Sequence, residues 1–423
     1  MTIQHHIKDG LTFGKMSKLK AVSLFSCGGI GDLGFKDAGI DVLLLSDFDQ
    51  RRLDFASNLH PNAKVIAGDI RVVQNEIIEN TKQLIGNDDL LVSLTPPCQG
   101  MSQNGINSLL KAVADGKREP VDERNYLVEP CFNIIEKLHP KFVFFENVTQ
   151  ALNAMLVVNG SPITYAAYFD ERLHSMGYKG KLQSTNFDDY GIPQARKRLI
   201  GIYVAEEHYE EELDYFPTKR AVTTLKQAIG NLPKLDASNS KSASREDYHS
   251  LHKVQPFRKD LYNWVASTPE GMSAFYNNTC TACGVTNNDK DIYCQACNTL
   301  LPKPSKIVDG THRLIKGFDT SYKRMTWNKP AHTVTTRSAF ASSSVNLHPS
   351  QNRVLSLFEC AVLQGINPFD IDWTEKSTGK LFPDFVLREV IGEAIPASFT
   401  KQVGQSLQQP NKAPATQLSL AVA

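Results

Sequence analysis

Two cysteine pairs in the second half of the chain have the spacing of a metal site. Cys280 and Cys283 form the first C-x-x-C pair, Cys294 and Cys297 form the second, and ten residues separate the two pairs. Four thiolates so arranged complete a closed tetrahedral zinc site, which keeps no open position for a substrate. The spacing therefore predicts a structural zinc ion, with unligated thiols or a redox pair as the alternatives.

A further cysteine, Cys98, has the surroundings of a nucleophile. It follows two prolines in Thr95-Pro96-Pro97-Cys98-Gln99, and a polar stretch with glycines comes directly after it. A nucleophilic thiol needs a rigid and accessible mount, which prolines at the end of a strand provide. A lone cysteine is more often a small core residue, but this flanking sequence favours the nucleophile.

Two other motifs carry charged groups suited to acid chemistry and to anion binding. Glu146 follows an apolar run and could act as an acid, with helix capping or a salt bridge as the alternative role. Gln194, Arg196 and Arg198 alternate in the sequence, so a strand would place them on one face. Guanidinium groups in a line suit a phosphate or a base edge, although a salt-bridged edge strand explains the same pattern.

Glycines and acids follow the apolar runs near the start of the chain. The segment 25–34 contains Gly28 and Gly29, and glycine between a strand and a helix lets a ligand approach the backbone, although a plain turn explains it equally well. Asp47 and Asp49 follow the next run, where an acid usually accepts hydrogen bonds from ribose hydroxyls, and Asp69 ends a third run. The glycine spacing differs from the dinucleotide fingerprint, so the pattern favours an adenosine-bearing cofactor without a phosphate-cradling loop.

The elements that must position these residues are short apolar runs alternating with helix-length stretches. Each run stops at turn or polar residues, as strands buried on both faces of a parallel sheet do; the runs are 21–25, 42–45, 90–94 and 142–145. This pattern predicts an α/β doubly wound domain with helices on both faces of the sheet. Because the chemically important residues lie just past these runs, we expect them to converge on one rim of the sheet.

Charge is distributed unevenly along the 423 residues. The whole chain has 46 Lys and Arg against 45 Asp and Glu, but residues 217–343 contain 18 of the former and 9 of the latter. This segment therefore carries a net +9, and the rest of the chain carries −8 to give the total of +1. A basic segment on an acidic body predicts a module that faces a polyanion, although a solvated charged face has the same composition.

Membrane and secreted classes are disfavoured by the sequence. No apolar run approaches the ~18 residues that span a bilayer, and residues 1–6 lack the features of a signal peptide. The sequence therefore predicts a cytoplasmic, reducing setting in which the eight cysteines are thiols or metal ligands.

Taken in order, the motifs resemble the cytosine-5 DNA methyltransferase family over about 19–204 and about 322–408. Segment 25–34 is similar to the family's methyl-donor loop and 95–99 to its nucleophile loop. Further similarities lie at 122–127, 146–148 (the acid motif), 189–198 (the arginine motif), 330–335, 353–364 and 392–396 (the closing motif). Two positions depart from the family pattern, because Cys27 stands where glycine is usual and Glu393 where asparagine is usual.

The resemblance implies a Rossmann-like S-adenosylmethionine-dependent methyltransferase sheet with a smaller inserted target-recognition domain. It places the catalytic domain at 19–204 and 344–408 and the recognition domain at 205–343, with a zinc-ribbon-like module at 278–300 and flexible termini at 1–18 and 409–423. The cofactor-binding residues that it implies are Phe25, Gly28, Gly29, Asp47, Phe48, Asp69, Ile70, Pro97, Leu127, Glu393 and Ile395.

The resemblance also implies a covalent mechanism on a cytosine that has left the duplex. Cys98 would add to carbon 6, Glu146 would protonate N3, and Arg198, with Arg196, would hold the base oxygen. Carbon 5 would then take the methyl group. The implied partners are double-stranded DNA and a restriction endonuclease that acts on the same site. The protein would be a monomer in the cytoplasm, and in a prokaryote it would lie at the nucleoid. The alternatives are an RNA (transfer RNA) cytosine-5 methyltransferase, a catalytically inert DNA-binding relative and, disfavoured by the glycine spacing, a dinucleotide oxidoreductase.

Overall fold

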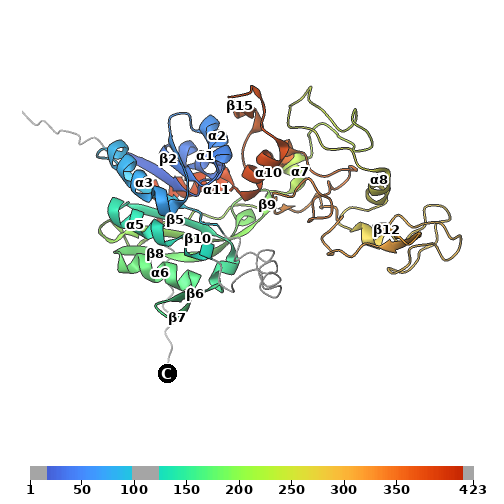
Figure 1. Cartoon of the computed structure of the whole chain (residues 1–423), viewed down its shortest axis with the longest axis horizontal. Coiled ribbons are helices and arrows are strands. Elements are labelled where there is room, and N and C mark those ends of the chain that lie inside the picture. The colour runs from blue at the N-terminus through green and yellow to red at the C-terminus, as the bar shows by residue number, and fades with distance from the viewer. Residues whose placement is uncertain (1–16, 98–122, 413–423) are drawn as a thin grey trace, which may run out of the picture.

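The computed structural model describes residues 17–97 and 123–412 of the chain. The predicted nucleophile Cys98 and most of the predicted terminal segments lie outside the described residues. The described part contains one large sheet and a lobe that extends away from it (Figure 1).

The large sheet has seven described strands in the order β3-β2-β1-β4-β5-β10-β8. The first five are parallel, whereas β10 runs antiparallel to both of its neighbours. Their bounds are β1 Leu19–Leu24, β2 Asp41–Asp47, β3 Lys64–Ala67, β4 Asp89–Leu94, β5 Phe142–Asn147, β8 Tyr178–Asn186 and β10 Lys197–Ala205. The four predicted runs are thus β1, β2, β4 and β5. The strand order reverses between β1 and β4, which is where open α/β sheets bind their ligands.

Helices cover both faces of this sheet, as the sequence predicted. On one face α3, α5 and α6 pack through residues such as Ile77, Phe132 and Phe169. On the other face α1 and α11 pack through Phe35 and Phe399. The bounds are α1 Ile30–Asp37, α2 Gln50–Leu59, α3 Ile70–Ile85, α5 Glu129–Leu138, α6 Tyr165–Ser175 and α11 Ala397–Gln408. The approach of α1 to α11 requires glycine at Gly34, because a Cβ there would lie 2.0 Å from the Ala397 carbonyl oxygen.

The predicted recognition segment divides between the lobe and the sheet body. Strand β11 (Leu213–Asp214) pairs with β17 (Asn411–Lys412), and Tyr215 and Phe216 are buried in the core beneath the sheet. This part of the segment 205–343 therefore packs on the body. Residues 233–250 form no helix or strand, but Leu235 is buried with its neighbours in a separate small core.

The lobe holds α8 (Lys259–Ala266) and the hairpin of β12 (Ser305–Val308) and β13 (Thr311–Leu314). Helix α7 (Leu225–Ile229) instead packs in a core that includes Phe55 of α2. Helix α10 (Asp384–Glu393) lies beside α7 in Figure 1, and α9 (Leu357–Leu363) packs in the same core. The remaining described strands are β6 Met155–Val158, β7 Ser161–Thr164, β9 Gln194–Ala195, β14 Ala331–His332, β15 Thr374–Glu375 and β16 Lys380–Leu381. Short 3-10 turns lie at Glu123–Tyr126, Thr149–Leu152, Phe187–Asp189, Glu206–His208, Ala274–Tyr276 and Pro368–Asp370. None of the helices in the described ranges has the length and apolar character needed to cross a membrane.

Candidate active site

A cavity of about 410 Å³ opens where the carboxyl ends of β1, β2, β4 and β5 meet. Most of the predicted site residues that the structure describes line it: Phe25, Gly28, Asp47, Phe48, Pro97, Glu146, Arg196, Arg198, Glu393 and Ile395. Four others, Gly29, Asp69, Ile70 and Leu127, do not line it. The convergence on one rim that the strand ends predicted is therefore observed for most of the set, and Pro97 brings the chain to this rim one residue before Cys98.

The acid and one arginine form an ion pair at the wall of this cavity. Glu146 near the end of β5 stands opposite Ile200 of the antiparallel strand β10, which brings Arg198 alongside it. The Arg198 Nε donates to Glu146 Oε1 at 2.8 Å, and the two side chains are only 16% and 11% exposed. The next residue, Asn147, donates from its amide to the Pro96 carbonyl at 3.3 Å. The acid and the nucleophile loop are thus held together by their strand ends.

Gln194 and Arg196 have other partners than the sequence pattern suggested. The strand is interrupted at Arg196, because β9 pairs with β14 and β10 begins only at Lys197. The Arg196 guanidinium donates to the carbonyls of Val334, Gly392 and Glu393 at 3.0–3.2 Å. The Gln194 amide binds Leu363, Gln364 and Val334 in the same buried region. Of the three alternating residues, Arg198 alone pairs with the acid, while Arg196 and Gln194 fasten later segments to the cavity wall.

The glycine loop after β1 is fixed by hydrogen bonds to the end of β2. The Cys27 amide donates to Asp47 Oδ2 at 2.9 Å, and the Asp49 amide donates to the other carboxylate oxygen at 3.0 Å. Gly29 has a φ of +69°, where glycine is favoured, and it precedes α1. Gly28 is required by packing, since a Cβ would lie 2.6 Å from the Val390 side chain. These glycines therefore serve the fold as well as the cavity that Gly28 lines.

Next to this loop is a cluster that sequence reasoning did not foresee. Arg52 of α2 forms an ion pair with Glu393 at 2.8 Å, and the Cys27 thiol donates to the same carboxylate at 3.7 Å. Cys27 has a φ of +51°, an uncommon conformation for a residue other than glycine. Burial, followed by the nearby Glu393 carboxylate, raises the pKa of the Cys27 thiol. The two positions that depart from the family pattern are therefore in contact with each other.

Asp32 is a second cavity residue that the sequence did not mark. It lies in the first turn of α1 with 4% of its surface exposed, and burial raises its pKa to about 7. Its only signal in the sequence was an acid among the buried positions of an amphipathic helix.

The predicted contacts at β3 have local structural roles. The Asp69 side chain caps α3 by accepting from the Arg71 amide at 2.9 Å, and it forms an ion pair with the same residue. Ile70 begins α3 and is buried in the core. Leu127 packs at the edge of that core.

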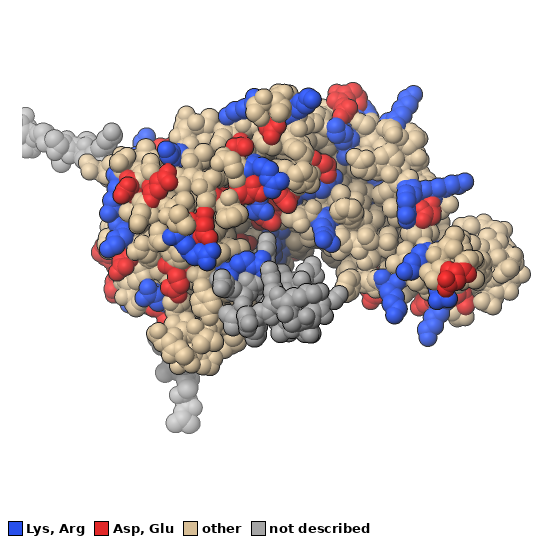
Figure 2. Space-filling view, viewed as in Figure 1, with Lys and Arg blue, Asp and Glu red and all other residues tan. Residues whose placement is uncertain are grey.

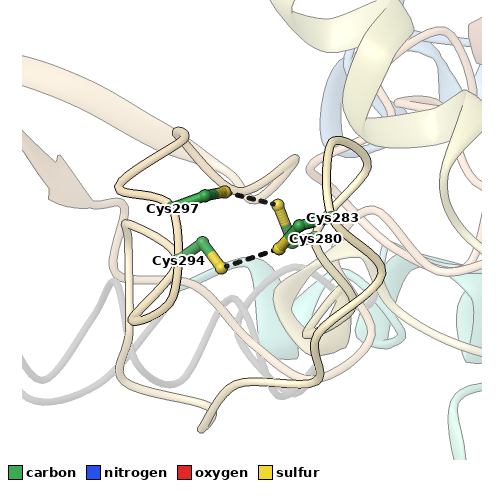
Figure 3. Close-up of side chains that lie close together, drawn as sticks. All are labelled: Cys280, Cys283, Cys294 and Cys297. Carbon is green, nitrogen blue, oxygen red and sulfur yellow. Dashed lines mark hydrogen bonds between the residues drawn. The ribbon is translucent and has the colours of Figure 1, made fainter.

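The four predicted zinc ligands come together in the lobe. Their sulfur atoms all lie within 4.8 Å of one another, and Figure 3 shows the two pairs facing each other. Cys280 lies 3.6 Å from Cys297 and Cys283 lies 3.5 Å from Cys294, both measured between sulfurs. A zinc ion bound at 2.3 Å would place such sulfurs about 3.8 Å apart. The arrangement is therefore close to the edges of a tetrahedron around one ion.

The backbone of each pair makes the same tight turn. The Gly284 amide donates to the Cys280 carbonyl, and the Asn298 amide donates to the Cys294 carbonyl, both at 2.9 Å. Gly284 and Asn298 both have positive φ, of +74° and +55°. The glycine and the asparagine that follow the two pairs are thus required by the turns that present the thiols.

Comparison with known proteins identifies a matching family and relatives of nearly full length. The model of the family described as C-5 cytosine-specific DNA methylase matches residues 19–409. The Type II methyltransferase M1.HgaI of Avibacterium volantium is 29% identical over 93% of this chain and 99% of its own length. The Type II methyltransferase M1.HphI of Haemophilus parahaemolyticus is 26% identical over 93% of this chain and 87% of its own length.

A solved structure shares the fold over nearly the whole chain. It is described as a DNA modification methyltransferase encoded within an E. coli prophage, and it superposes with a TM-score of 0.58 at 20% identity. The superposition covers 92% of this chain and 99% of that one. At this identity the likeness describes the arrangement of elements and not the chemistry.

Proposed function

Because the chain belongs to the C-5 cytosine-specific DNA methylase family and is a DNA cytosine-5 methyltransferase, we propose that the residues around this cavity carry out the reaction. The observation that carries the proposal is the Arg198–Glu146 pair, which lines the same cavity as Pro97, the neighbour of Cys98. A thiol, a carboxyl group and a guanidinium are then available together to one flipped base.

The proposed sequence of steps begins with addition of the Cys98 thiolate to carbon 6 of cytosine. Glu146 donates a proton to N3 as electron density moves through the ring, so carbon 5 becomes nucleophilic. Arg198 holds Glu146 in place and donates to the base oxygen. After methylation of carbon 5, a base removes the proton there, the Cys98 thiolate is expelled, and N3 returns its proton to Glu146, so the aromatic ring is restored. Arg196 acts here as a positioning residue through the three carbonyls that it binds.

The residues near β1 and β2 fit an adenosine-bearing methyl donor. Phe48 offers an aromatic face that is 76% exposed at the cavity, and the adjacent Asp47 carboxylate is oriented by two backbone amides. An apolar surface beside a fixed polar group is typical of a nucleoside site. S-adenosylmethionine would supply the electrophilic methyl group. Its site would be completed by Phe25, Gly28, Pro97, Glu393 and Ile395. The residues that do not line the cavity would support these contacts through the surrounding structure: Gly29, Asp69, Ile70 and Leu127.

The domain division that we propose follows the sequence motifs. The catalytic domain comprises 19–204 and 344–408, and the recognition domain comprises 205–343 with a zinc-ribbon-like module at 278–300. A structural Zn²⁺ held by Cys280, Cys283, Cys294 and Cys297 would stabilise this module, since their sulfurs have near-tetrahedral spacing.

The biological setting that we propose is a restriction-modification system. Two relatives of nearly full length are named Type II methyltransferases. By analogy the chain would act in the cytoplasm as a monomer on a specific duplex sequence, and a cognate endonuclease would act on the same sequence.

Labelled methyl transfer from S-adenosylmethionine tests the proposed chemistry. Duplex DNA should accept label and transfer RNA should not, in assays run side by side. Cys98→Ala should abolish transfer, because no thiolate then adds to carbon 6. Bisulfite sequencing of DNA from cells expressing the chain would identify the base and its sequence. Substantial turnover by Cys98→Ala would contradict the covalent mechanism, and transfer to RNA alone would contradict the choice of substrate.

A further inference from the structure

The hairpin of β12 and β13 is a two-stranded ribbon on the lobe, far from the cavity (Figure 1). Its strands join through Asp309 and Gly310, which both have positive φ, as a tight hairpin turn requires. Directly opposed residues share one face of such a ribbon. One face therefore carries the pair Lys306 and Arg313, and the other carries the pair Ile307 and His312.

The pair Lys306 and Arg313 is unfavourable for the hairpin itself. Two like charges directly opposite each other destabilise an antiparallel pair, and both side chains are exposed. Among the described residues, Lys306 makes no ion pair, and Arg313 makes only a long one of 3.8 Å with the 85% exposed Asp309. A ribbon that keeps two cations side by side without close counter-charges is arranged for an anion outside the molecule.

The other face of the ribbon meets the cysteine module at His312, whereas Ile307 on that face is 67% exposed. The His312 ring packs edge-on against Tyr293, and Ser305 bonds to the same ring. Just before β12, the buried Lys303 ammonium donates to the carbonyls of Asn288, Asp289 and Asp291 at 2.8–3.1 Å. The contacts of Lys303 and His312 thus join the ribbon to the cysteine module.

Other lysines of the lobe extend the positive character of this region. Lys290 and Lys316 are exposed and make no ion pair within the part of the chain that the structure describes. Figure 2 shows blue side chains along the lower edge of the lobe, near the place of β12 in Figure 1, with some red side chains among them. The catalytic body is net acidic, so this basic region is the part of the molecule suited to approach a polyanion first.

We propose that the Lys306–Arg313 face of the ribbon binds backbone phosphates of duplex DNA at a distance from the flipped cytosine. A two-stranded ribbon has the width that a major groove admits, and two cations on one face can contact phosphates at its edge. Such contacts position the duplex without reading its sequence. This inference rests on the proposed action on duplex DNA, and it adds a second anchoring point outside the cavity.

The salt dependence of DNA binding tests the ribbon directly. Each phosphate contact contributes about 0.9 to the slope of log affinity against log salt concentration. The double variant Lys306→Gln/Arg313→Gln should therefore lower that slope by about 1.8 on a duplex of any sequence. Fluorescence anisotropy with a labelled duplex, from low to moderate potassium chloride concentration, measures it. The variant Lys306→Arg/Arg313→Lys keeps both charges and should keep the slope.

A matched control removes the same charge elsewhere. Lys137 of α5 and Lys179 of β8 lie on the side of the sheet body away from the lobe (Figure 1). Lys137→Gln/Lys179→Gln should leave the slope unchanged, and bound metal should stay the same in every variant. If the ribbon variant keeps the wild-type slope while the wild type methylates DNA, the ribbon inference is wrong and the proposed function stands. If the ribbon variant lowers the slope only for binding to single-stranded RNA, or if the wild type does not bind duplex DNA at all, the ribbon inference and the proposed function both fail.

Discussion

The cavity and the ribbon use charge in opposite ways. In the cavity each guanidinium has partners inside the protein: Arg198 binds Glu146, Arg52 binds Glu393, and Arg196 binds three carbonyls. On the ribbon the cations point outward, and Lys306 and Arg313 stand side by side. Internal pairing holds a reactive geometry in place before a neutral base arrives. Exposed cations without close counter-charges are instead suited to a polyanion and contribute mainly to attraction and positioning.

The two regions also obtain their rigidity from different sources. The cavity lies at one edge of the large sheet, whose seven described strands have apolar cores on both faces. The cysteine module has a small buried cluster in which Leu301 accompanies Cys280 and Cys294. So small a cluster buries too little apolar surface to hold a fold alone, and a metal commonly takes that role.

Removal of the metal should therefore impair the cysteine module and leave the cavity intact. This is the largest effect that we expect. Structural zinc sites in small modules contribute apparent binding energies of about 10–16 kcal/mol. Chelation, or Cys280→Ser/Cys283→Ser, should abolish specific DNA binding while cofactor binding to the body persists. Metal analysis should give about one zinc per chain in the wild type and none in the variant, with DNA binding followed by anisotropy. Loss of cofactor binding together with the metal would show instead that the body depends on the lobe.

Replacement of Glu146 should disable the cavity and leave the lobe intact. Glu146→Gln removes the proton donor and the counter-charge of Arg198, so the rate of methyl transfer should fall by about 10²–10⁴. Single-turnover quench measurements give the rate, while calorimetry with the cofactor and anisotropy with DNA should show little change. Glu76→Gln on the exposed side of α3 is the matched control and should behave as wild type. A parallel loss of DNA affinity would contradict the separation of the two regions.

The parts of the fold that sequence could predict are those fixed by local pattern. Continuous apolar runs bounded by turn residues predicted β1, β2, β4 and β5, and the cysteine spacing predicted the cluster. Both signals lie within a few residues of the feature that they predict. The convergence of strand ends followed because parallel strands share one edge of the sheet.

Features that depend on distant partners could not be predicted. Alternation placed Gln194 and Arg196 beside Arg198, but β9 pairs with β14, more than a hundred residues later, and the strand breaks between them. Arg52 gave no signal because its partner Glu393 is 341 positions away. The pairing of β11 with β17, about two hundred residues later, gave no signal for the same reason.

Relief of the backbone strain at Cys27 is the smallest effect that we expect, and it tests what stabilises the loop beside the cavity. A residue other than glycine in the left-handed region costs about 1 kcal/mol, and Cys27 has a φ of +51°. Cys27→Gly should relieve that strain, partly offset by the freer unfolded chain, and raise the free energy of unfolding by up to about 1 kcal/mol. Cys27→Ala keeps the strain and removes only the thiol, so it should not gain stability. Urea unfolding of the three proteins gives the comparison. If Cys27→Gly and Cys27→Ala change the free energy of unfolding equally, the loss of the thiol contact to Glu393, and not backbone strain, accounts for the change.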